Sequence, residues 1–368
     1  MKILHINTER TWRGGEQQTL YLLQALKKRN IASWLVCQPG SPMQEKAGQA
    51  GIDVAPVAMR GEFDPVAALR IRSLIRKHDF SVIHCHTSHA QTIAYLASFG
   101  TGVRRLVTRR VDFSIYRHSF LKLSGIKYRL MADYYIAISQ KIKEVLVNDG
   151  IAEERIFVVH SGIDPHRFRQ ATGGNLTNEF DIRQNQKVVI NVAHLAGHKG
   201  QLYLVRAIPL VLAKLPDTRF FIIGQGALMD ELKAAAAELG LKKELVLTGF
   251  REDVADFYRI AELFVMSSVK EGLGTAVLDA LASGIPVVAT RTGGLPEIIR
   301  DGETGRLVAP ASPEALADGI VDMLIHADSA GQMARKGRER VLQDFSIDAM
   351  AAGNIEVYRC VSQASGSG

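Results

Sequence analysis

The chain carries Glu271-Gly-Leu-Gly-Thr-Ala-Val-Leu-Asp-Ala-Leu-Ala-Ser-Gly-Ile-Pro-Val-Val-Ala-Thr290, in which a glycine-flanked acid, a helical pattern and an apolar strand follow one another directly. A loop, a helix and a buried strand in that order place the N-terminus of the helix beside the edge of a parallel sheet. Free backbone N–H groups make such a helix end a binding site for an anion. The carboxylates of Glu271 and Asp279 would repel a phosphate, so we expect them to bind hydroxyl groups, as on a sugar or a ribose.

Short apolar runs alternate with amphipathic segments along almost the whole chain. Strands that alternate with helices are typical of parallel, doubly wound sheets, so we expect an α/β fold. The expected helices include residues 16–28, 65–78, 89–99, 140–148, 201–214 and 227–239. The expected strands cover residues 3–6, 33–36, 54–57, 82–86, 105–108, 135–138 and 156–159, followed by 187–192, 219–223, 245–247, 263–266, 286–289 and 304–308.

The length of 368 residues suits two domains of ordinary size. We expect one Rossmann-like domain over residues 1–172 and a second over residues 173–346, with the boundary in the polar stretch Gly173-Gly174-Asn175. The two domains would face each other across a central cleft. Residues 347–368 would form a helix that returns to the first domain, followed by a disordered tail.

The cysteines and the apolar runs indicate the compartment. Cys37, Cys85 and Cys360 show no metal-ligand spacing, and their odd number argues against a disulfide framework, as in a reducing compartment. The first strand is too short for a signal peptide, and no apolar run approaches the length of a membrane span. We therefore expect a cytoplasmic protein, and a peripheral position on the inner face of the plasma membrane stays open.

Basic residues are concentrated in the first half. Residues 1–168 contain 24 Lys and Arg against 14 Asp and Glu, a balance of +10, whereas the remainder has a balance of −3. Basic and aromatic residues mix most closely over residues 104–129, as suits an anionic lipid surface or a phosphorylated glycolipid. A solvated helix with an apolar core face is the alternative. No nucleic-acid motif accompanies the basic residues, so we expect no nucleic-acid partner. The residues assigned here to acceptor or membrane contact are Arg109, Arg110, Arg117 and Lys122.

The motif E-G-x-G-x-x-x-L-[acid]-A-x-A-x-G-x-P-V-V-A-T at residues 271–290 resembles the retaining GT-B glycosyltransferases of family 4, also called group 1. Further motifs follow the family's order over nearly the whole chain. The resemblance implies a GT-B fold, an acceptor-binding first domain, a nucleotide-sugar-binding second domain and a hexosyltransferase-type activity. The further motifs that follow the family's order are Gly14-Gly15-Glu16, His84-Cys85-His86, Ser161-Gly162-Ile163-Asp164, Lys199-Gly200, Gly224-Gln225-Gly226 and Gly249-Phe250.

Such an enzyme must stabilise a departing diphosphate. Lys199 stands at the mouth of the second sheet, where its ammonium could neutralise a phosphate oxygen, and the helix beginning near Gly274-Thr275 adds free N–H groups. Gly14 and Gly15 would let the backbone of the first domain approach the diphosphate. The strand-end loops carry no D-x-D motif, so we expect these fixed charges to replace a metal ion and expect no cofactor. The alternatives are a solvated Lys199 and an ordinary tight turn at Gly14-Gly15.

The resemblance also assigns the two acids. Glu271 corresponds to the acid that contacts hydroxyl groups of the donor sugar. Asp279 stands where the family usually has a glutamate that binds the ribose, which shortens the reach by roughly 1.5 Å. A helical side chain leans toward the helix N-terminus, so Asp279 still points at the pocket; an acid that favours the helix dipole is the alternative. Further donor-binding positions are Gly224, Phe250, Gly272, Leu273, Gly274 and Thr275.

His194 departs from the family pattern. The family usually has an arginine there, which makes phosphate contacts together with the lysine. A histidine can still donate a hydrogen bond, but its charge depends on pH. We therefore expect His194 to contact the donor, with Arg251 or another nearby base as compensation.

Histidines at the end of a strand invite two interpretations. His84 and His86 point to the same face, but no acid or cysteine joins them and His89 in the sequence, so we expect no metal site. The resemblance assigns His86 to the catalytic set beside Glu271 and Lys199, and a core histidine is the alternative. It also implies that the departing diphosphate, rather than a protein nucleophile, assists deprotonation of the acceptor.

The sequence thus favours a retaining, metal-independent glycosyltransferase that moves a sugar from a nucleotide diphosphate-sugar, with a UDP-sugar favoured, to a bacterial surface glycan or glycolipid. A lipopolysaccharide core is a plausible acceptor. The alternatives are a UDP-N-acetylglucosamine 2-epimerase-like enzyme of the same architecture and a non-catalytic nucleotide-sugar-binding protein. A dehydrogenase is disfavoured because no G-x-G-x-x-G follows the first strand.

Overall fold

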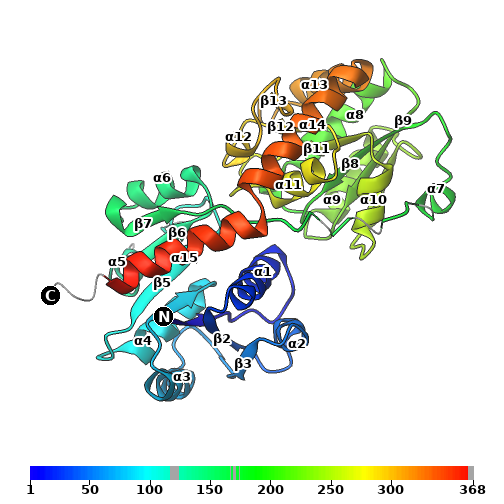
Figure 1. Cartoon of the computed structure of the whole chain (residues 1–368). Coiled ribbons are helices and arrows are strands. Elements are labelled where there is room, and N and C mark those ends of the chain that lie inside the picture. Colours follow the sequence, from blue (N-terminus) through cyan, green and yellow to red (C-terminus); the bar gives the residue numbers. More distant parts are fainter. Residues whose placement is uncertain (117–123, 166, 169–170, 174, 364–368) are drawn as a thin grey trace. The chain divides into compact units, whose positions relative to one another are not determined.

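The contacts of the chain divide it into two compact units (Figure 1). One unit comprises Met1–Gly162 and the C-terminal segment from Ile347, and the other comprises Ile163–Ser346. The structure is a computed structural model, and it describes residues 1–116, 124–165, 167–168, 171–173 and 175–363.

The second unit begins earlier than the expected boundary at residue 173. Ile163 belongs to it because its N–H donates to the Phe345 carbonyl over 2.9 Å and because it forms an isolated β-bridge with Ser346. The polar stretch around Gly173 therefore lies inside the second unit. The expected disordered tail lies outside the described residues.

The described part of the first unit forms a seven-stranded parallel sheet in the order β3-β2-β1-β4-β5-β6-β7, with helices on it. The strand order reverses direction between β1 and β4. The strands are β1 (Lys2–Ile6), β2 (Ala32–Cys37), β3 (Asp53–Pro56), β4 (Val82–Cys85), β5 (Arg104–Arg109), β6 (Tyr134–Ala137) and β7 (Ile156–Val158). The helices are α1 (Gly14–Lys28), α2 (Pro42–Gln49), α3 (Pro65–His78), α4 (Ser88–Ser98), α5 (Ser124–Leu130), α6 (Gln140–Asn148) and α15 (Ile347–Gln363).

Side-chain caps explain where these helices begin. Asp64 Oδ1 accepts from the Ala67 N–H over 2.9 Å, and Pro65 at the first position of α3 needs no hydrogen-bond partner. Thr87 caps α4 and Ser139 caps α6 in the same way. In each of these three helices, a side chain after the preceding strand starts the helix.

The C-terminal helix α15 completes the core of the first unit. Tyr358 on this helix is fully buried, together with Ala351 and Val361, and packs with Leu26 of α1 and Leu106 of β5 in one apolar cluster. The expectation that the last helix belongs to the first domain agrees with this packing.

The described part of the second unit forms a six-stranded parallel sheet in the order β10-β9-β8-β11-β12-β13. Here the order reverses between β8 and β11. The strands are β8 (Lys187–Val192), β9 (Thr218–Ile223), β10 (Leu245–Gly249), β11 (Leu263–Met266), β12 (Val287–Thr290) and β13 (Arg306–Val308). The helices are α7 (Leu176–Glu179), α8 (Gln201–Leu212), α9 (Met229–Glu238), α10 (Val254–Ile260), α11 (Thr275–Ala282), α12 (Leu295–Ile298), α13 (Pro313–Ile325) and α14 (Ala327–Asp344).

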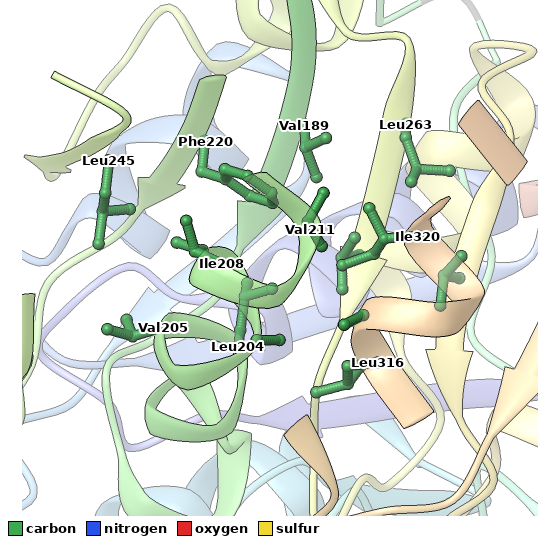
Figure 2. Packing of buried hydrophobic residues seen from close by; sticks show 14 of the residues in the cluster. Val189, Leu204, Val205, Ile208, Val211, Phe220, Leu245, Leu263, Leu316 and Ile320 are labelled. Atoms are coloured by element: carbon green, nitrogen blue, oxygen red, sulfur yellow. The ribbon is translucent and has the colours of Figure 1, made fainter. Parts of the chain in front are cut away.

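Helices α8 and α13 cover one face of this sheet (Figure 2). Leu204 and Ile208 of α8 and Leu316 and Ile320 of α13 are fully buried against strand residues such as Phe220. Each expected strand of the chain is present, with bounds that agree within two residues. The expected α/β class with two Rossmann-like sheets is confirmed.

Ligands of doubly wound sheets bind at the carboxyl ends of the strands, where the strand order reverses. In the first unit the residues after β1 and β4 occupy that position, which includes Gly14, Gly15 and His86. In the second unit the residues after β8 and β11 occupy it, which includes Lys199 and Glu271. The topology therefore places most residues singled out by sequence at the two binding edges.

Candidate active site

The loops after β8 and β11 bring together two of the residues expected to act on the donor. Lys199 Nζ lies 2.7 Å from Glu271 Oε2, and Ser268 Oγ donates to the same carboxylate oxygen over 2.9 Å. Glu271 is buried, and the Lys199 side chain is 19% exposed. Two donors fix the orientation of the carboxylate, and charge-assisted hydrogen bonds of this kind are strong. Sequence reasoning did not single out Ser268.

Backbone contacts hold the two loops against each other. The His198 carbonyl accepts from the Val269 N–H over 2.8 Å and from the Lys270 N–H over 3.1 Å. Gly200 has a φ of +66°, and a β-carbon there would collide with the Ser267 carbonyl oxygen. The glycine after Lys199 is therefore required by both conformation and space.

A third loop supports Glu271 from behind. The Gly294 N–H donates to the Glu271 carbonyl over 3.1 Å, and Thr290 Oγ1 donates to the Ser268 carbonyl over 2.5 Å. Gly293 has a φ of +57°, and a β-carbon on it would collide with the Glu271 carbonyl oxygen. Sequence reasoning stopped at Thr290 and missed this contact, although the pair of glycines after β12 was a signal for a close backbone approach.

The N-terminus of α11 adjoins the same carboxylate. Gly274 precedes the helix with a φ of +99°, and its β-carbon position lies 3.6 Å from Glu271 Cγ. No side chain caps the helix, so the first-turn N–H groups near Thr275 are left for a ligand. Gly272 and the buried Leu273 form the short link between the acid and the helix. An anion beside Lys199 would meet the positive end of the helix dipole.

The ends of β8, β9 and β10 place the remaining donor candidates of the second unit. Gly224 has a φ of +147°, its N–H donates to the Gly249 carbonyl over 2.9 Å, and a β-carbon on it would collide with the Ala193 carbonyl. His194 and Phe250 are exposed at the same edge. The structure thus brings His194, Gly224 and Phe250 to the carboxyl edge of one sheet.

Arg251 is already engaged by acids. Its guanidinium forms paired hydrogen bonds with both Glu179 oxygens, at 2.7 and 2.9 Å, and with Asp253 at 2.8 and 2.7 Å. The hydrogen bonds that Arg251 donates to Asp253 and Glu179 raise its pKa. Two carboxylates therefore neutralise the charge that the sequence offered as compensation for His194.

Asp279 lies on α11 in a different electrostatic setting from Glu271. Its Oδ2 atom is 3.5 Å from Arg167 Nη1, and its side chain is 17% exposed. Burial raises the pKa of Asp279 to about 6, Arg167 opposes the rise, and Asp164 adds to it. Arg167 is a partner that the sequence did not reveal. Binding of a ribose by Asp279 stays a prediction.

Three histidines cluster at the carboxyl edge of the first unit. His5 Nδ1 lies 3.0 Å from His86 Nε2, while His84 Nδ1 lies 2.6 Å from the Tyr358 hydroxyl and His84 Nε2 lies 2.6 Å from Thr108 Oγ1. His5 comes from β1 and was not predicted, whereas His89 is exposed outside the cluster. The cluster therefore fixes His86 through the neighbouring strand and the C-terminal helix.

Burial keeps these imidazoles neutral. It lowers the pKa of His5 to about 3 and that of His84 and His86 well below the usual value. One ring nitrogen from each lies within 4.8 Å of the others, so the group could hold a metal ion. The positive charge of Arg110 also depresses the pKa of His84 and His86, and it would oppose a cation there. That no metal is required stays a prediction.

Gly14 and Gly15 open α1 beside this cluster. A β-carbon on Gly14 would meet open space, whereas one on Gly15 would lie 3.7 Å from Arg110 Cδ. Glu16 accepts from the Arg13 N–H over 3.1 Å through Oε2, which fixes the turn. The open space at Gly14 leaves room for a ligand, and contact of either glycine with the donor stays a prediction.

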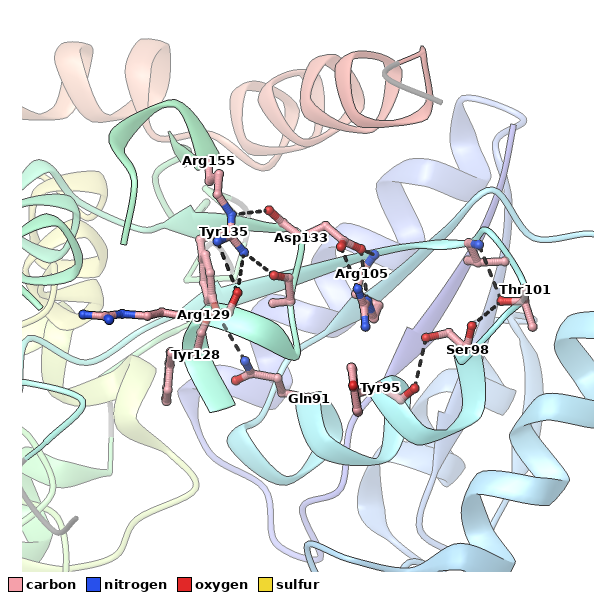
Figure 3. Close-up of polar contacts among 12 residues, drawn as sticks. Gln91, Tyr95, Ser98, Thr101, Arg105, Tyr128, Arg129, Asp133, Tyr135 and Arg155 are labelled. Carbon is pink, nitrogen blue, oxygen red and sulfur yellow. Dashed lines mark hydrogen bonds and ion pairs between the residues drawn. The ribbon is translucent and has the colours of Figure 1, made fainter. Parts of the chain in front are cut away.

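Several arginines of the basic segment at residues 104–129 make contacts within the first unit. Arg109 is half-buried and donates to the Tyr128 hydroxyl and the Phe113 carbonyl, both over 2.6 Å. Burial lowers the pKa of Arg110 to about 10, with Glu16 acting against the shift. Figure 3 shows Arg105 bonded to Asp133, with 2.7 Å between the charged atoms. Arg105 and Arg109 are thus held by contacts within the first unit. Contact of Arg109 or Arg110 with an acceptor or a membrane stays a prediction, and Arg117 and Lys122 lie outside the described residues.

Comparison with known proteins identifies the class. The family described as Glycosyl transferases group 1 matches residues 175–340, and the family described as Glycosyltransferase Family 4 matches residues 12–167. With the two parallel sheets and the site after β8 and β11, these matches define a GT-B glycosyltransferase. The chain belongs to glycosyltransferase family 4, group 1, and is an enzyme of the hexosyltransferase type.

Individual relatives are distant but cover most of the chain. A GDP-mannose-dependent alpha-(1-6)-phosphatidylinositol monomannoside mannosyltransferase of Mycolicibacterium smegmatis is 28% identical and covers 82% of each chain. A UDP-Gal:alpha-D-GlcNAc-diphosphoundecaprenol alpha-1,3-galactosyltransferase of Escherichia coli is 22% identical and covers 94% of each. The crystal structure of Anabaena HepE in complex with UDP and glucose has a TM-score of 0.85 at 20% identity, covering 98% of this chain and all of that one.

The described helices include none with the length and hydropathy of a membrane span.

Proposed function

We propose that the protein is a retaining, metal-independent glycosyltransferase that moves a sugar from a nucleotide diphosphate-sugar to a bacterial cell-surface glycan or glycolipid. A UDP-sugar is the favoured donor, and a lipopolysaccharide core is one acceptor of the expected kind. The second unit would bind the donor and the first unit the acceptor. A lipid-borne acceptor would bring the enzyme to the inner face of the plasma membrane.

The pairing of Lys199 with Glu271 beside the start of α11 carries this proposal. Transfer breaks the bond between the anomeric carbon of the sugar and a diphosphate oxygen, and negative charge develops on that oxygen. The ammonium of Lys199 and the uncapped N–H groups of α11 lie where they could stabilise this charge. Fixed positive groups of this kind would supply what a metal ion supplies elsewhere.

The acids and His86 would orient the substrates. Glu271, held by Lys199 and Ser268, offers its second oxygen to hydroxyl groups of the donor sugar. Asp279 would bind the ribose, and the neutral, buried His86 would accept or donate one hydrogen bond near the sugar. The diphosphate oxygen would take the proton of the acceptor hydroxyl on the face that it leaves, so the configuration at the anomeric carbon is retained without a protein nucleophile.

The relatives support the substrate classes only in part. The Escherichia coli relative is named for UDP-Gal and a diphosphoundecaprenol-linked acceptor, and HepE was crystallised with UDP. The mycobacterial relative is named for GDP-mannose and a phosphatidylinositol acceptor. Both named acceptors are lipid-linked, and we carry that feature over to this protein.

A nucleotide-sugar panel tests the proposal. Thermal unfolding would be followed with UDP- and GDP-sugars, because a ligand at about 100 times its Kd stabilises the folded state by about 2.7 kcal/mol. The donor that stabilises the protein would then be incubated with glycan and glycolipid acceptors, with and without EDTA. We expect an acceptor-dependent product with retained anomeric configuration and no loss in EDTA. Release of UDP with formation of an epimer, in the absence of an acceptor, would instead indicate the epimerase-like alternative.

A further inference from the structure

Helices α3 and α4 of the first unit lie side by side (Figure 1). Large apolar side chains on and beside both helices are exposed. Phe63, just before α3, is 71% exposed, Leu69 is 67% exposed and Phe99, just after α4, is 70% exposed. Exposed apolar residues that occur singly are ordinary, but a group over two packed helices marks an interaction surface. We call this group the α3–α4 patch; it consists of Phe63, Val66, Leu69, Leu96 and Phe99.

The exposed face of α3 is apolar in its first half and basic in its second. Ala67, Ala68, Ile71 and Ile75 point into the unit and are buried. At 3.6 residues per turn, the opposite face carries Val66 and Leu69, followed by Arg70, Arg76 and Lys77. All of these residues are exposed. Burial in the core therefore does not account for the apolar residues on this face.

Basic groups near the patch lack acidic partners. None of Arg70, Arg76 and Lys77 forms an ion pair with another residue in the described ranges. Two nearby carboxylates are committed elsewhere, since Asp64 caps α3 and Glu62 pairs with Lys127 at 2.5 Å. Because the exposed Asp79 at the end of α3 opposes only one of the three basic groups, the surface keeps a net positive charge next to exposed aromatic and aliphatic side chains.

One contact ties the two helices of the patch together. Arg72 Nη1 donates to the Phe99 carbonyl over 2.5 Å and to the Ala97 carbonyl over 3.2 Å. The end of α4, and with it Phe99, is thereby anchored to the middle of α3. The patch belongs to a folded platform rather than to a free loop.

We propose that the α3–α4 patch docks the enzyme on an anionic lipid surface, with Phe63, Leu69 and Phe99 inserted at the level of the headgroups and Arg70, Arg76 and Lys77 against lipid phosphates. Apolar and basic residues on one helical face are the combination that binds such an interface. The patch lies on other elements than Arg109 and Arg110. The inference deepens the proposed function, on which it rests for its purpose, because a lipid-borne acceptor lies at that surface.

Sedimentation of the full chain with vesicles tests the docking. Vesicles of phosphatidylglycerol and phosphatidylcholine should bind the protein, and vesicles of phosphatidylcholine alone should bind it far less. Raising the salt concentration from about 0.1 M to about 1 M shortens the Debye length from about 10 Å to about 3 Å and should weaken the binding. Equal binding to both vesicle types, or none to either, would overturn the proposal.

Matched variants locate the surface. The double variant Phe63→Ser with Leu69→Ser should bind anionic vesicles at least about tenfold less, since binding scales with buried apolar area. Leu210→Ser with Leu239→Ser, at exposed leucines of the second unit, should bind as the unchanged protein does. An equal loss of vesicle binding in both double variants, or no loss in the Phe63 and Leu69 variant, would contradict the assignment of docking to the α3–α4 patch. Arg70→Gln with Arg76→Gln and Lys77→Gln should also weaken binding and reduce its salt dependence.

Two further readouts distinguish membrane docking from the proposed sugar transfer and from dimerisation of the chain. Thermal stabilisation by the donor should persist in the Phe63 and Leu69 variant, which shows that the second unit remains folded and competent. Sugar transfer without vesicle binding would contradict the docking proposal but not the proposed activity. Vesicle binding without transfer to any acceptor would support the docking proposal and contradict the proposed activity. If the unchanged chain dimerises in sedimentation velocity and the same variant abolishes the dimer without changing vesicle binding, the patch is a contact between copies of the chain and the proposal fails.

Discussion

Lys199 Nζ lies 2.7 Å from Glu271 Oε2, so the cation proposed to neutralise the diphosphate is held by the acid proposed to bind the sugar. The two residues come from loops after β8 and β11, on either side of the point where the strand order reverses. Each side chain therefore depends on the other for its position. A change at either residue should affect contacts with both the diphosphate and the sugar of the donor.

Glutamine at position 271 tests the role of the carboxylate charge. Glu271→Gln keeps the shape of the side chain but loses the ion pair and the anionic acceptor for hydroxyl groups. Hydrogen bonds to charged groups contribute about 1.5–3 kcal/mol, so we expect kcat/KM to fall by roughly 10- to 150-fold. Glu339→Gln, at an exposed position on α14, is the control and should leave transfer unchanged. Unchanged kcat/KM in Glu271→Gln would remove Glu271 from the site.

Asp279 should make stability depend on pH. Burial raises the pKa of Asp279 to about 6, above its value in the unfolded chain, so the folded state holds this proton more tightly. The stabilisation that this proton gives the folded state is present in full below about pH 4 and is lost as the pH rises through about 6. The free energy of unfolding changes by at most about 3 kcal/mol. Asp279→Asn should therefore gain stability over the unchanged protein between pH 4 and pH 7.5. A difference in unfolding free energy that stays constant over this range would contradict the shift.

Alanine at Gly293 should disturb the support of Glu271. The substitution imposes both an unfavourable positive φ and a collision with the Glu271 carbonyl. Gly240 is a matched control, with a φ of +69° and open space around its β-carbon position. We expect Gly240→Ala to cost about 1–2 kcal/mol, the strain alone. Gly293→Ala should cost more and should also reduce transfer; equal losses in denaturant unfolding would argue against the close contact.

Arginine at position 194 should restore the family pattern. His194 is exposed at the edge that carries Lys199, and the nearby Arg251 is neutralised by Glu179 and Asp253. A permanent positive charge at position 194 should leave kcat unchanged. The KM for the donor should stay the same or fall. Steady-state kinetics with varied donor concentration would measure this. A large loss of activity in His194→Arg would mean that the histidine has a specific role of its own.

The order of elements and much of the donor edge were predictable because their signals are local. Residues 65–78, 140–148, 187–192 and 263–266 form helices and strands with the predicted bounds. Apolar periodicity and caps such as Asp64 determine these elements within a few residues of chain. Lys199 and Glu271 were predictable as neighbours because parallel strands end at a common edge.

Features that depend on distant pairing were not predictable. His5 meets His86 only because β1 pairs with β4 in the register that sets His5 beside His84. Arg110 looked like a surface residue in a basic run, but the end of β5 turns it toward Glu16 and the start of α1. Gly293 supports Glu271 through a close backbone contact, and the glycine pair indicated a close approach without indicating its partner. Each case needs the register or the loop path as well as the residue type.

Sugar transfer by Lys199→Ala, measured with the donor that stabilises the protein, tests the central claim most directly. Lys243→Ala, an exposed lysine before β10, is the matched control. We predict that Lys199→Ala remains folded by thermal unfolding and loses transfer, because the leaving diphosphate loses its neutralising charge, while Lys243→Ala keeps full activity. Normal turnover by Lys199→Ala would contradict the assignment of this edge to the donor diphosphate.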